Sequence, residues 1–141
     1  MRLLLLVLAI SFSAGAAVKK FNFFYSGIEG RNRVYLSCDY AEYQLEKFLT
    51  QIGGEKIDVR CSGGIQNGWV SPVSLYSTYE IKDIDMSGEE LAIKSDFNSN
   101  CFFDTKLLNQ LLDKQDHLEV TNSRSGCFRN DSRYFFNINF L

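Results

Sequence analysis

The segment from Cys38 to Cys61 restricts the fold more than any other part of the chain. Apolar residues in its first half recur at intervals of four, three and four residues: Ala41, Leu45, Phe48 and Ile52. This spacing places them on one stripe of an amphipathic helix. Gly53-Gly54 follows and can adopt the positive φ at which helices commonly end. The segment therefore predicts a helix, a turn and a strand, with a cysteine at each end.

The residues that flank this helix alternate as they do in strands. The apolar face contains Val34, Leu36 and Cys38 before the helix and Ile57, Val59 and Cys61 after it. Alternate residues of a strand share one face, so both cysteines lie on the side that the helix must cover. We therefore expect a disulfide between Cys38 and Cys61.

A second segment, from Cys101 to Cys127, repeats this plan. Its apolar helical stripe consists of Leu107, Leu108, Leu111 and Leu112. A strand follows, in which Leu118 and Val120 face inward, and Cys127 lies a few residues beyond it. Four cysteines permit three pairings, and the sequence alone does not choose among them. The repeated pattern favours Cys101–Cys127 as the second disulfide.

Acidic residues near the start of each expected helix predict how it begins. Asp39 can accept hydrogen bonds from the free amides of the first turn, and Glu42 can reach back to the amide of the cap. Asp104 can cap the second helix in the same way. We therefore expect Asp39 and Asp104 to cap the two helices.

Two β-α-β units in succession predict the order β-α-β-β-α-β, which is the split βαβ arrangement of ferredoxin-like folds. Further alternating segments predict added strands: residues 20–26, 73–82, 91–97 and 133–141. We therefore expect an α+β fold, in which an antiparallel sheet carries two helices on one face and two disulfides hold the structure.

The first 16 residues have the pattern of a secretory signal peptide. Arg2 is basic, residues 3–12 are apolar, and Ala14-Gly15-Ala16 is a small-x-small cleavage sequence. The apolar run is shorter than the roughly 20 residues that a transmembrane helix needs. We expect a signal peptide over residues 1–16, one disulfide-bonded domain over residues 17–141, and a secreted or periplasmic location without a membrane span.

The charge of the expected mature chain argues against nucleic acid as a partner. Without Arg2, 14 basic and 17 acidic side chains remain, a net charge of −3. A nucleic-acid-binding protein needs a clustered basic surface. The basic residues here form only short pairs, Lys19-Lys20 and Arg31/Arg33, which are typical of ordinary surface.

No residue pattern indicates a catalytic centre, a metal site or a cofactor. His117 is the single histidine, and no nucleophile motif accompanies it. No two cysteines form a C-x-x-C pair, so the sequence does not indicate zinc binding or thioredoxin-like redox chemistry. A secreted hydrolase remains an alternative if Asp39, Glu42 or His117 line one cleft.

Three aromatic residues are the candidate binding residues. Tyr35 lies between two inward-facing residues, so its ring faces away from the helices, and Tyr76 follows the inward-facing Leu75 in the same way. A ferredoxin-like strand order would place these two tyrosines side by side on the open sheet face. Trp69, in the glycine-rich segment 62–69, would lie at the rim.

This pattern predicts a small exported binding or accessory domain that is not an enzyme and contacts a protein or glycan partner. A hydrolase, or a secreted inhibitor or toxin-like effector, are the alternatives, and the oligomeric state is left open.

Overall fold

The structure is a computed structural model that describes residues 16–97, 99–127 and 133–141. Apart from Ala16, the predicted signal peptide lies outside these residues. Two helices are present, α1 (Cys38–Gln51) and α2 (Cys101–Asp113). The strands are β1 (Lys19–Tyr25), β2 (Ile28–Glu29), β3 (Asn32–Arg33), β4 (Gly54–Gln66), β5 (Trp69–Ile81), β6 (Glu90–Lys94), β7 (Leu118–Gly126) and β8 (Arg133–Phe140).

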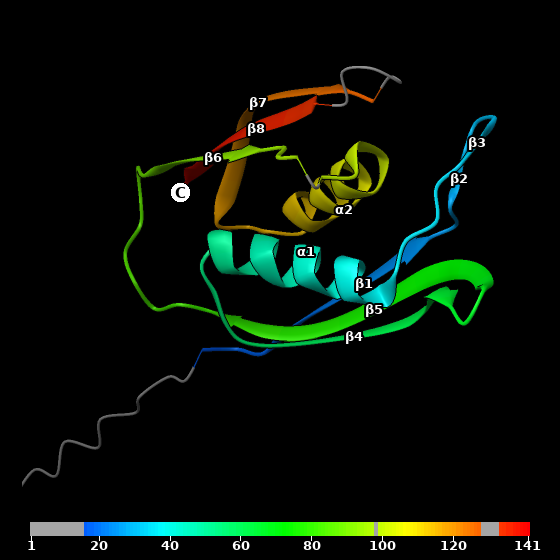
Figure 1. Cartoon of the computed structure of the whole chain (residues 1–141). Coiled ribbons are helices and arrows are strands. Elements are labelled where there is room, and N and C mark those ends of the chain that lie inside the picture. Colours follow the sequence, from blue (N-terminus) through cyan, green and yellow to red (C-terminus); the bar gives the residue numbers. More distant parts are fainter. Residues whose placement is uncertain (1–15, 98, 128–132) are drawn as a thin grey trace, which may run out of the picture.

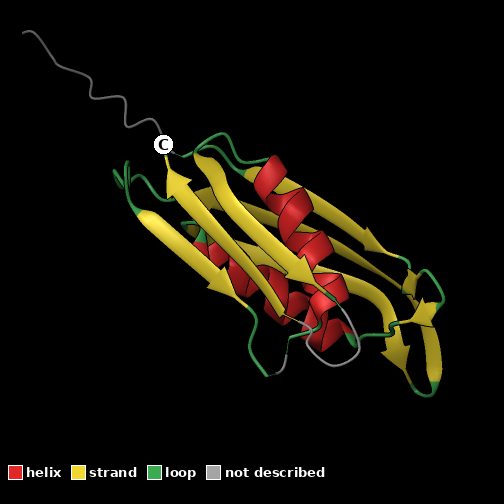
Figure 2. Ribbon diagram, turned by 90° about the horizontal axis from the view of Figure 1, so that it is seen from above, coloured by secondary structure: helices red, strands yellow, loops and turns green. Residues whose placement is uncertain are grey.

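The main strands form two separate antiparallel sheets with the same strand order. The first sheet is β1-β5-β4 and the second is β6-β8-β7. Figure 1 shows α1 and α2 between these sheets, so that the helices form the middle of three layers. Figure 2, seen from above, shows strands in front of the two helices and strands behind them. The short β2–β3 hairpin projects from one end of the molecule.

The α+β class, the two helices and the antiparallel pairing are confirmed, but the ferredoxin-like arrangement is not. Each half of the chain is a β-α-β-β unit whose last strand pairs with both of the others, which completes a three-stranded sheet within that half. The link over residues 82–89 then crosses from the first sheet to the second (Figure 1). The internal repeat is therefore present, but its two copies do not share one sheet.

The buried stripes of the helices belong to the core that also contains residues of both sheets. α2 buries adjacent pairs of residues in successive turns: Phe103 and Asp104, Leu107 and Leu108, Leu111 and Leu112. α1 does the same with Gln44 and Leu45 and with Phe48 and Leu49. This spacing is that of an ordinary amphipathic helix with one apolar face. The single sheet was predicted from the element order β-α-β-β-α-β, and strand pairing within each half of the chain gives two sheets instead.

The helices begin differently from the prediction. Ser37 caps α1, and its Oγ accepts a hydrogen bond from the amide three residues later at 3.2 Å. Asn100 caps α2 with its Oδ1 in the same way at 3.1 Å. Each cap comes one residue before the cysteine, because the cysteine is already the first helical residue. The predicted caps are therefore wrong: Asp39 lies in the first turn, and Asp104 is buried inside the protein.

Both predicted disulfides are present, Cys38–Cys61 and Cys101–Cys127. Each joins the first residue of a helix to the strand that follows it or to the residue just beyond that strand. The two bridges therefore hold the same position in the two halves of the chain.

One continuous set of buried side chains joins the two halves. Phe103 of α2 is fully buried, and its ring contacts Phe23 and Tyr25 of β1 edge to face. The second helix thus packs against a strand of the first sheet. Among the described residues, neither helix is long and apolar enough to cross a membrane.

Candidate functional site

The layered fold exposes the outer face of each sheet, because the helices cover only the inner faces. On the first sheet, the strand register arranges the outer residues in three rows: Lys20–Thr78–Asp58, Asn22–Tyr76–Arg60 and Phe24–Ser74–Ser62. The middle member of each row belongs to β5. This face therefore combines two aromatic rings with amide, hydroxyl and charged groups.

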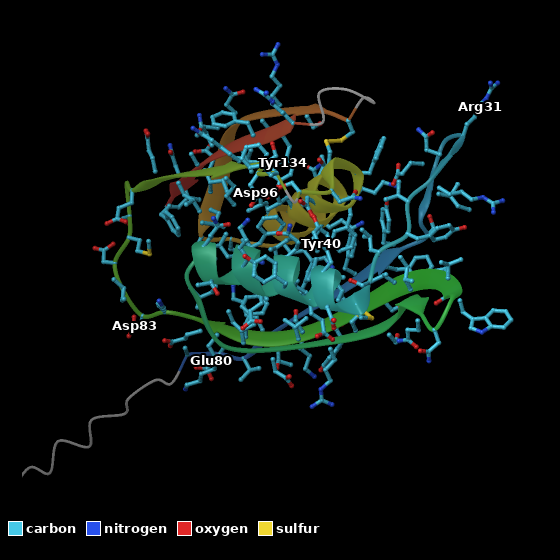
Figure 3. All side chains as sticks on the ribbon, viewed as in Figure 1. Arg31, Tyr40, Glu80, Asp83, Asp96 and Tyr134 are labelled. Carbon is cyan, nitrogen blue, oxygen red and sulfur yellow. A yellow bond between two sulfur atoms is a disulfide. The ribbon has the colours of Figure 1, made fainter. Side chains whose placement is uncertain are left out.

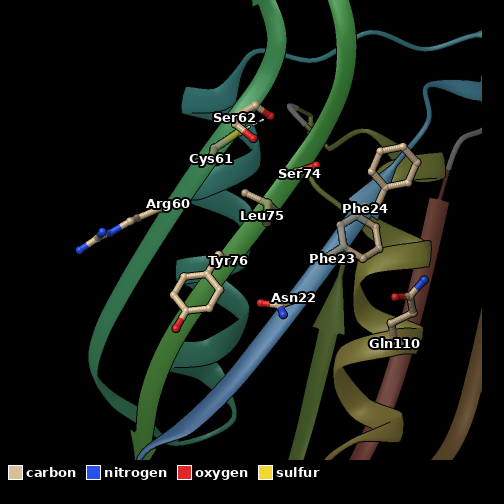
Figure 4. A pocket seen from close by; sticks show the side chains of 10 residues that line it. All are labelled: Asn22, Phe23, Phe24, Arg60, Cys61, Ser62, Ser74, Leu75, Tyr76 and Gln110. Atoms are coloured by element: carbon tan, nitrogen blue, oxygen red, sulfur yellow. Dashed lines mark hydrogen bonds between the residues drawn. The ribbon is translucent and has the colours of Figure 1, made fainter.

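A shallow, open hollow of about 630 Å³ lies on this face (Figure 4). Phe24 and Tyr76 line it, and their side chains are 62% and 40% exposed. They occupy diagonal positions on neighbouring strands, where side chains lie close enough for one ligand to contact both. Arg60 lies beside Tyr76 on the far strand and forms an exposed ion pair with Asp58 at 3.3 Å. The hollow thus has aromatic contact area and hydrogen-bonding groups.

The structure places the predicted tyrosines apart. Tyr76 lies on the outer face of the central strand, as its direction predicted. Tyr35 lies between β3 and α1, outside the two three-stranded sheets, and its ring lies against Gly27. The position expected for the Tyr35 strand is occupied by β1, which pairs with β5 over its whole length. The side-by-side placement of Tyr35 and Tyr76 is therefore wrong.

Trp69 lies at the far end of the β4–β5 hairpin and is 81% exposed. The glycine-rich segment 62–69 is not a loop, because β4 continues through Gly63 and Gly64 at a break in the register. The chain reverses at Asn67-Gly68, where both residues have positive φ. Asn-Gly between strands is the sequence that favours this two-residue turn. That dipeptide was the signal for a long hairpin and was missed.

The residues of the alternative hydrolase do not converge. Asp39 and Glu42 lie at the start of α1, and the Glu42 carboxylate accepts a hydrogen bond from the Cys61 amide at 2.9 Å. The His117 ring lies beyond the other end of α1, with Nε2 3.1 Å from the carbonyl oxygen of Ile52. A helix of 14 residues separates the two places, which is roughly 20 Å. These groups therefore cannot act on one bond together.

A buried polar cluster lies where α1, α2 and β8 meet. The Asp104 carboxylate is fully buried and accepts hydrogen bonds from the hydroxyls of Tyr40 at 3.0 Å and Tyr134 at 3.1 Å. The Tyr40 oxygen in turn accepts from the Asn100 amide at 2.6 Å and from Gln44 Nε2 at 2.9 Å. Figure 3 shows Tyr40 and Tyr134 within this central region.

Burial raises the pKa of Asp104 from 3.8 to about 6, although hydrogen bonds from Tyr40 and Tyr134 favour the charged form and oppose this shift. Burial also raises the pKa of both tyrosines well above the ordinary value. Sequence reasoning missed this cluster. The available signal was an acidic residue inside the apolar stripe of α2, next to Phe103 and one turn before Leu107 and Leu108.

Within the described parts of the chain, no three histidine, cysteine or carboxylate side chains are grouped so that they could hold a metal ion. Comparison of the chain with protein-family profiles, with curated proteins and with solved structures finds no match. The candidate site therefore depends on geometry alone.

Proposed function

We propose that the protein is an exported, non-enzymatic binding domain that holds a glycan on the outer face of β1-β5-β4. The observation that carries this proposal is the exposed pair Phe24 and Tyr76 at the hollow on that face. The two disulfides support an extracellular setting, because such bonds persist in oxidising compartments.

The chemistry of this face suits a sugar chain. A pyranose ring has a face of C–H groups that packs on an aromatic ring, and its hydroxyls both donate and accept hydrogen bonds. Phe24 and Tyr76 provide the rings. Asn22 and Arg60 flank Tyr76 in its row, and these side chains provide several N–H donors and an amide oxygen. Such a mixture of aromatic area and a few polar groups is typical of small-ligand sites.

The size of the face favours an oligosaccharide over a protein partner. β1 pairs with β5 over seven residues, and β4 pairs on the other side of β5. Three strands spaced about 4.8 Å apart, at about 3.3 Å per residue, cover roughly 300 Å². A standard protein interface buries about 800 Å² on each partner. The part of this face where all three strands pair is thus smaller than a standard protein interface and large enough for a few sugar units.

The test is binding of the purified mature protein to an array of oligosaccharides, followed by titration calorimetry with the sugar that binds best. We expect the double variant Phe24→Thr, Tyr76→Thr to lose at least tenfold in affinity, about 1.4 kcal/mol. Threonine suits strands, so the double variant should remain folded. Tyr43→Ala is the matched control, because Tyr43 is also 62% exposed but lies on α1.

Unchanged sugar binding by a folded double variant would show that this face does not hold the ligand. Trp69→Ala would then test the end of the β4–β5 hairpin, which was predicted to lie at the rim. Failure to bind any oligosaccharide on the array would contradict the glycan proposal.

A further inference from the structure

The buried polar cluster crosses the boundary between the two halves of the chain. Tyr40 and Gln44 belong to α1 of the first half, whereas Asp104 belongs to α2 and Tyr134 to β8 of the second half. Asp104 accepts hydrogen bonds from both tyrosines, so a single carboxylate connects elements from both halves. Any change in its charge must therefore affect the contact between them.

No cation of the described residues forms an ion pair with the buried Asp104 carboxylate. Among the described residues, four other titratable or charged groups face it: Tyr40 and Lys47 from α1, Tyr134 from β8, and Asp96 from the segment before α2. The Lys47 ammonium group is 3.3 Å from the Asp96 carboxylate, with which it forms an ion pair at the rim of the cluster. The charged form of Asp104 is therefore stabilised mainly by neutral hydroxyl donors, which compensate burial of a charge only in part.

The side-chain amide of Gln44 could accept a hydrogen bond from Asp104 when Asp104 is protonated. Gln44 Nε2 is 3.5 Å from Asp104 Oδ2, and Gln44 Oε1 is buried with no hydrogen-bond partner among the described residues. Rotation of the Gln44 amide by half a turn would bring Oε1 to the side of Asp104. There it could accept the hydrogen bond that a protonated carboxyl group donates. Neutral Asp104 would gain an acceptor in this way, in exchange for the hydrogen bond from Gln44 Nε2 to the Tyr40 oxygen.

We propose that this cluster is a proton-controlled clamp, in which protonation of Asp104 tightens the junction between the two halves and deprotonation loosens it. A buried acid favours its neutral form, so the folded protein holds this proton more tightly than the unfolded chain. The contribution to stability is therefore complete below the unfolded pKa of 3.8 and is lost as the pH rises through the folded pKa of about 6. The difference between the folded and the unfolded pKa of Asp104 corresponds to a change of roughly a hundredfold in the unfolding equilibrium constant, about 3 kcal/mol.

The test compares urea unfolding of the wild type and Asp104→Asn at pH 4.5 and pH 7.5. Asparagine keeps the shape of the neutral acid but does not titrate. We expect the ratio of the unfolding constants, wild type over variant, to rise about 25-fold from pH 4.5 to pH 7.5, because part of the full change already occurs below pH 4.5. Asp39→Asn, which changes an exposed carboxylate on α1, should show no such rise. The wild type and each variant share all other titratable groups, so the pH dependence that those groups give to stability cancels in the ratio.

A second readout tests the clamp itself. At pH 7.5 the amide of Asn100, which donates to Tyr40, should exchange with deuterium more slowly in Asp104→Asn than in the wild type. At pH 4.5 the two proteins should exchange alike. A ratio of unfolding constants that does not change with pH would overturn the proposal. If the ratio of unfolding constants changes with pH but the Asn100 amide exchanges equally fast in both proteins, the proposed loosening of the junction would be wrong.

If Asp104→Asn does not fold, carbon-13 NMR titration of the Asp104 carboxyl group in the wild type decides. A midpoint below pH 4.5 would overturn the proposal, and a midpoint near 6 would support it.

Discussion

Replacement of Phe103 by alanine should destabilise the protein more than any comparable change within one half of the core. Phe103 is fully buried on α2, and its ring centre lies 5.6 Å from that of Phe23, 5.3 Å from that of Tyr25 and 6.0 Å from that of Tyr40. All three neighbours belong to the first half of the chain, whereas Phe103 belongs to the second. The variant therefore removes the aromatic contact between the halves.

The magnitude follows from burial and from the ring contacts. A buried Phe→Ala change costs about 3–5 kcal/mol through lost burial and the cavity that remains. Each edge-to-face ring pair adds about 0.5–1.5 kcal/mol. Phe48 of α1 is equally buried, but none of the ring pairs found among the described residues involves it. With three such pairs, we expect Phe103→Ala to cost about 1.5–4.5 kcal/mol more than Phe48→Ala.

The assay is urea unfolding of the oxidised proteins at one pH, with the free energy of unfolding taken by linear extrapolation. Asn109→Ala, on the exposed side of α2, is the control and should change stability by less than about 0.5 kcal/mol. If Phe103→Ala is unfolded without urea, Phe103→Leu replaces it in the comparison. A loss for Phe103→Ala equal to or smaller than that for Phe48→Ala would refute the idea that this ring joins the two halves.

Two further predictions concern the framework of the first sheet. The variant Gly63→Ala should unfold at a lower urea concentration than Gly68→Ala, although both glycines have positive φ. A side chain at position 63 would meet the carbonyl of Pro72, whereas Gly68 faces open space. The conformational cost is about 1–2 kcal/mol at either site, and equal losses would contradict the close approach. Removal of the first bridge, by Cys38→Ala with Cys61→Ala, should lower the free energy of unfolding by about 3.5 kcal/mol, and unchanged urea unfolding would show that it does not constrain the unfolded chain.

The sequence predicted those features that depend on neighbours along the chain. Residues at intervals of three and four place Leu45 and Phe48 on one side of a helix, whatever that helix later contacts. Alternation in a strand places Cys61 on the inner face and Tyr76 on the outer one. Both disulfides were predicted, although the argument from alternation was wrong for Cys38, which is the first residue of α1 and not the end of a strand.

The tertiary structure decided which elements cover one another. Strand pairing joins residues far apart in the chain, so no local pattern shows that β1 pairs with β5 and leaves Tyr35 outside the sheet. The same holds for Asp104, whose position at the start of α2 suits an exposed cap. It is buried because α1 and β8 pack over it with Tyr40 and Tyr134 as hydrogen-bond donors. Periodicity indicates which side of a helix or strand is apolar. Only packing between elements determines what lies against that side and whether a charged group there is buried.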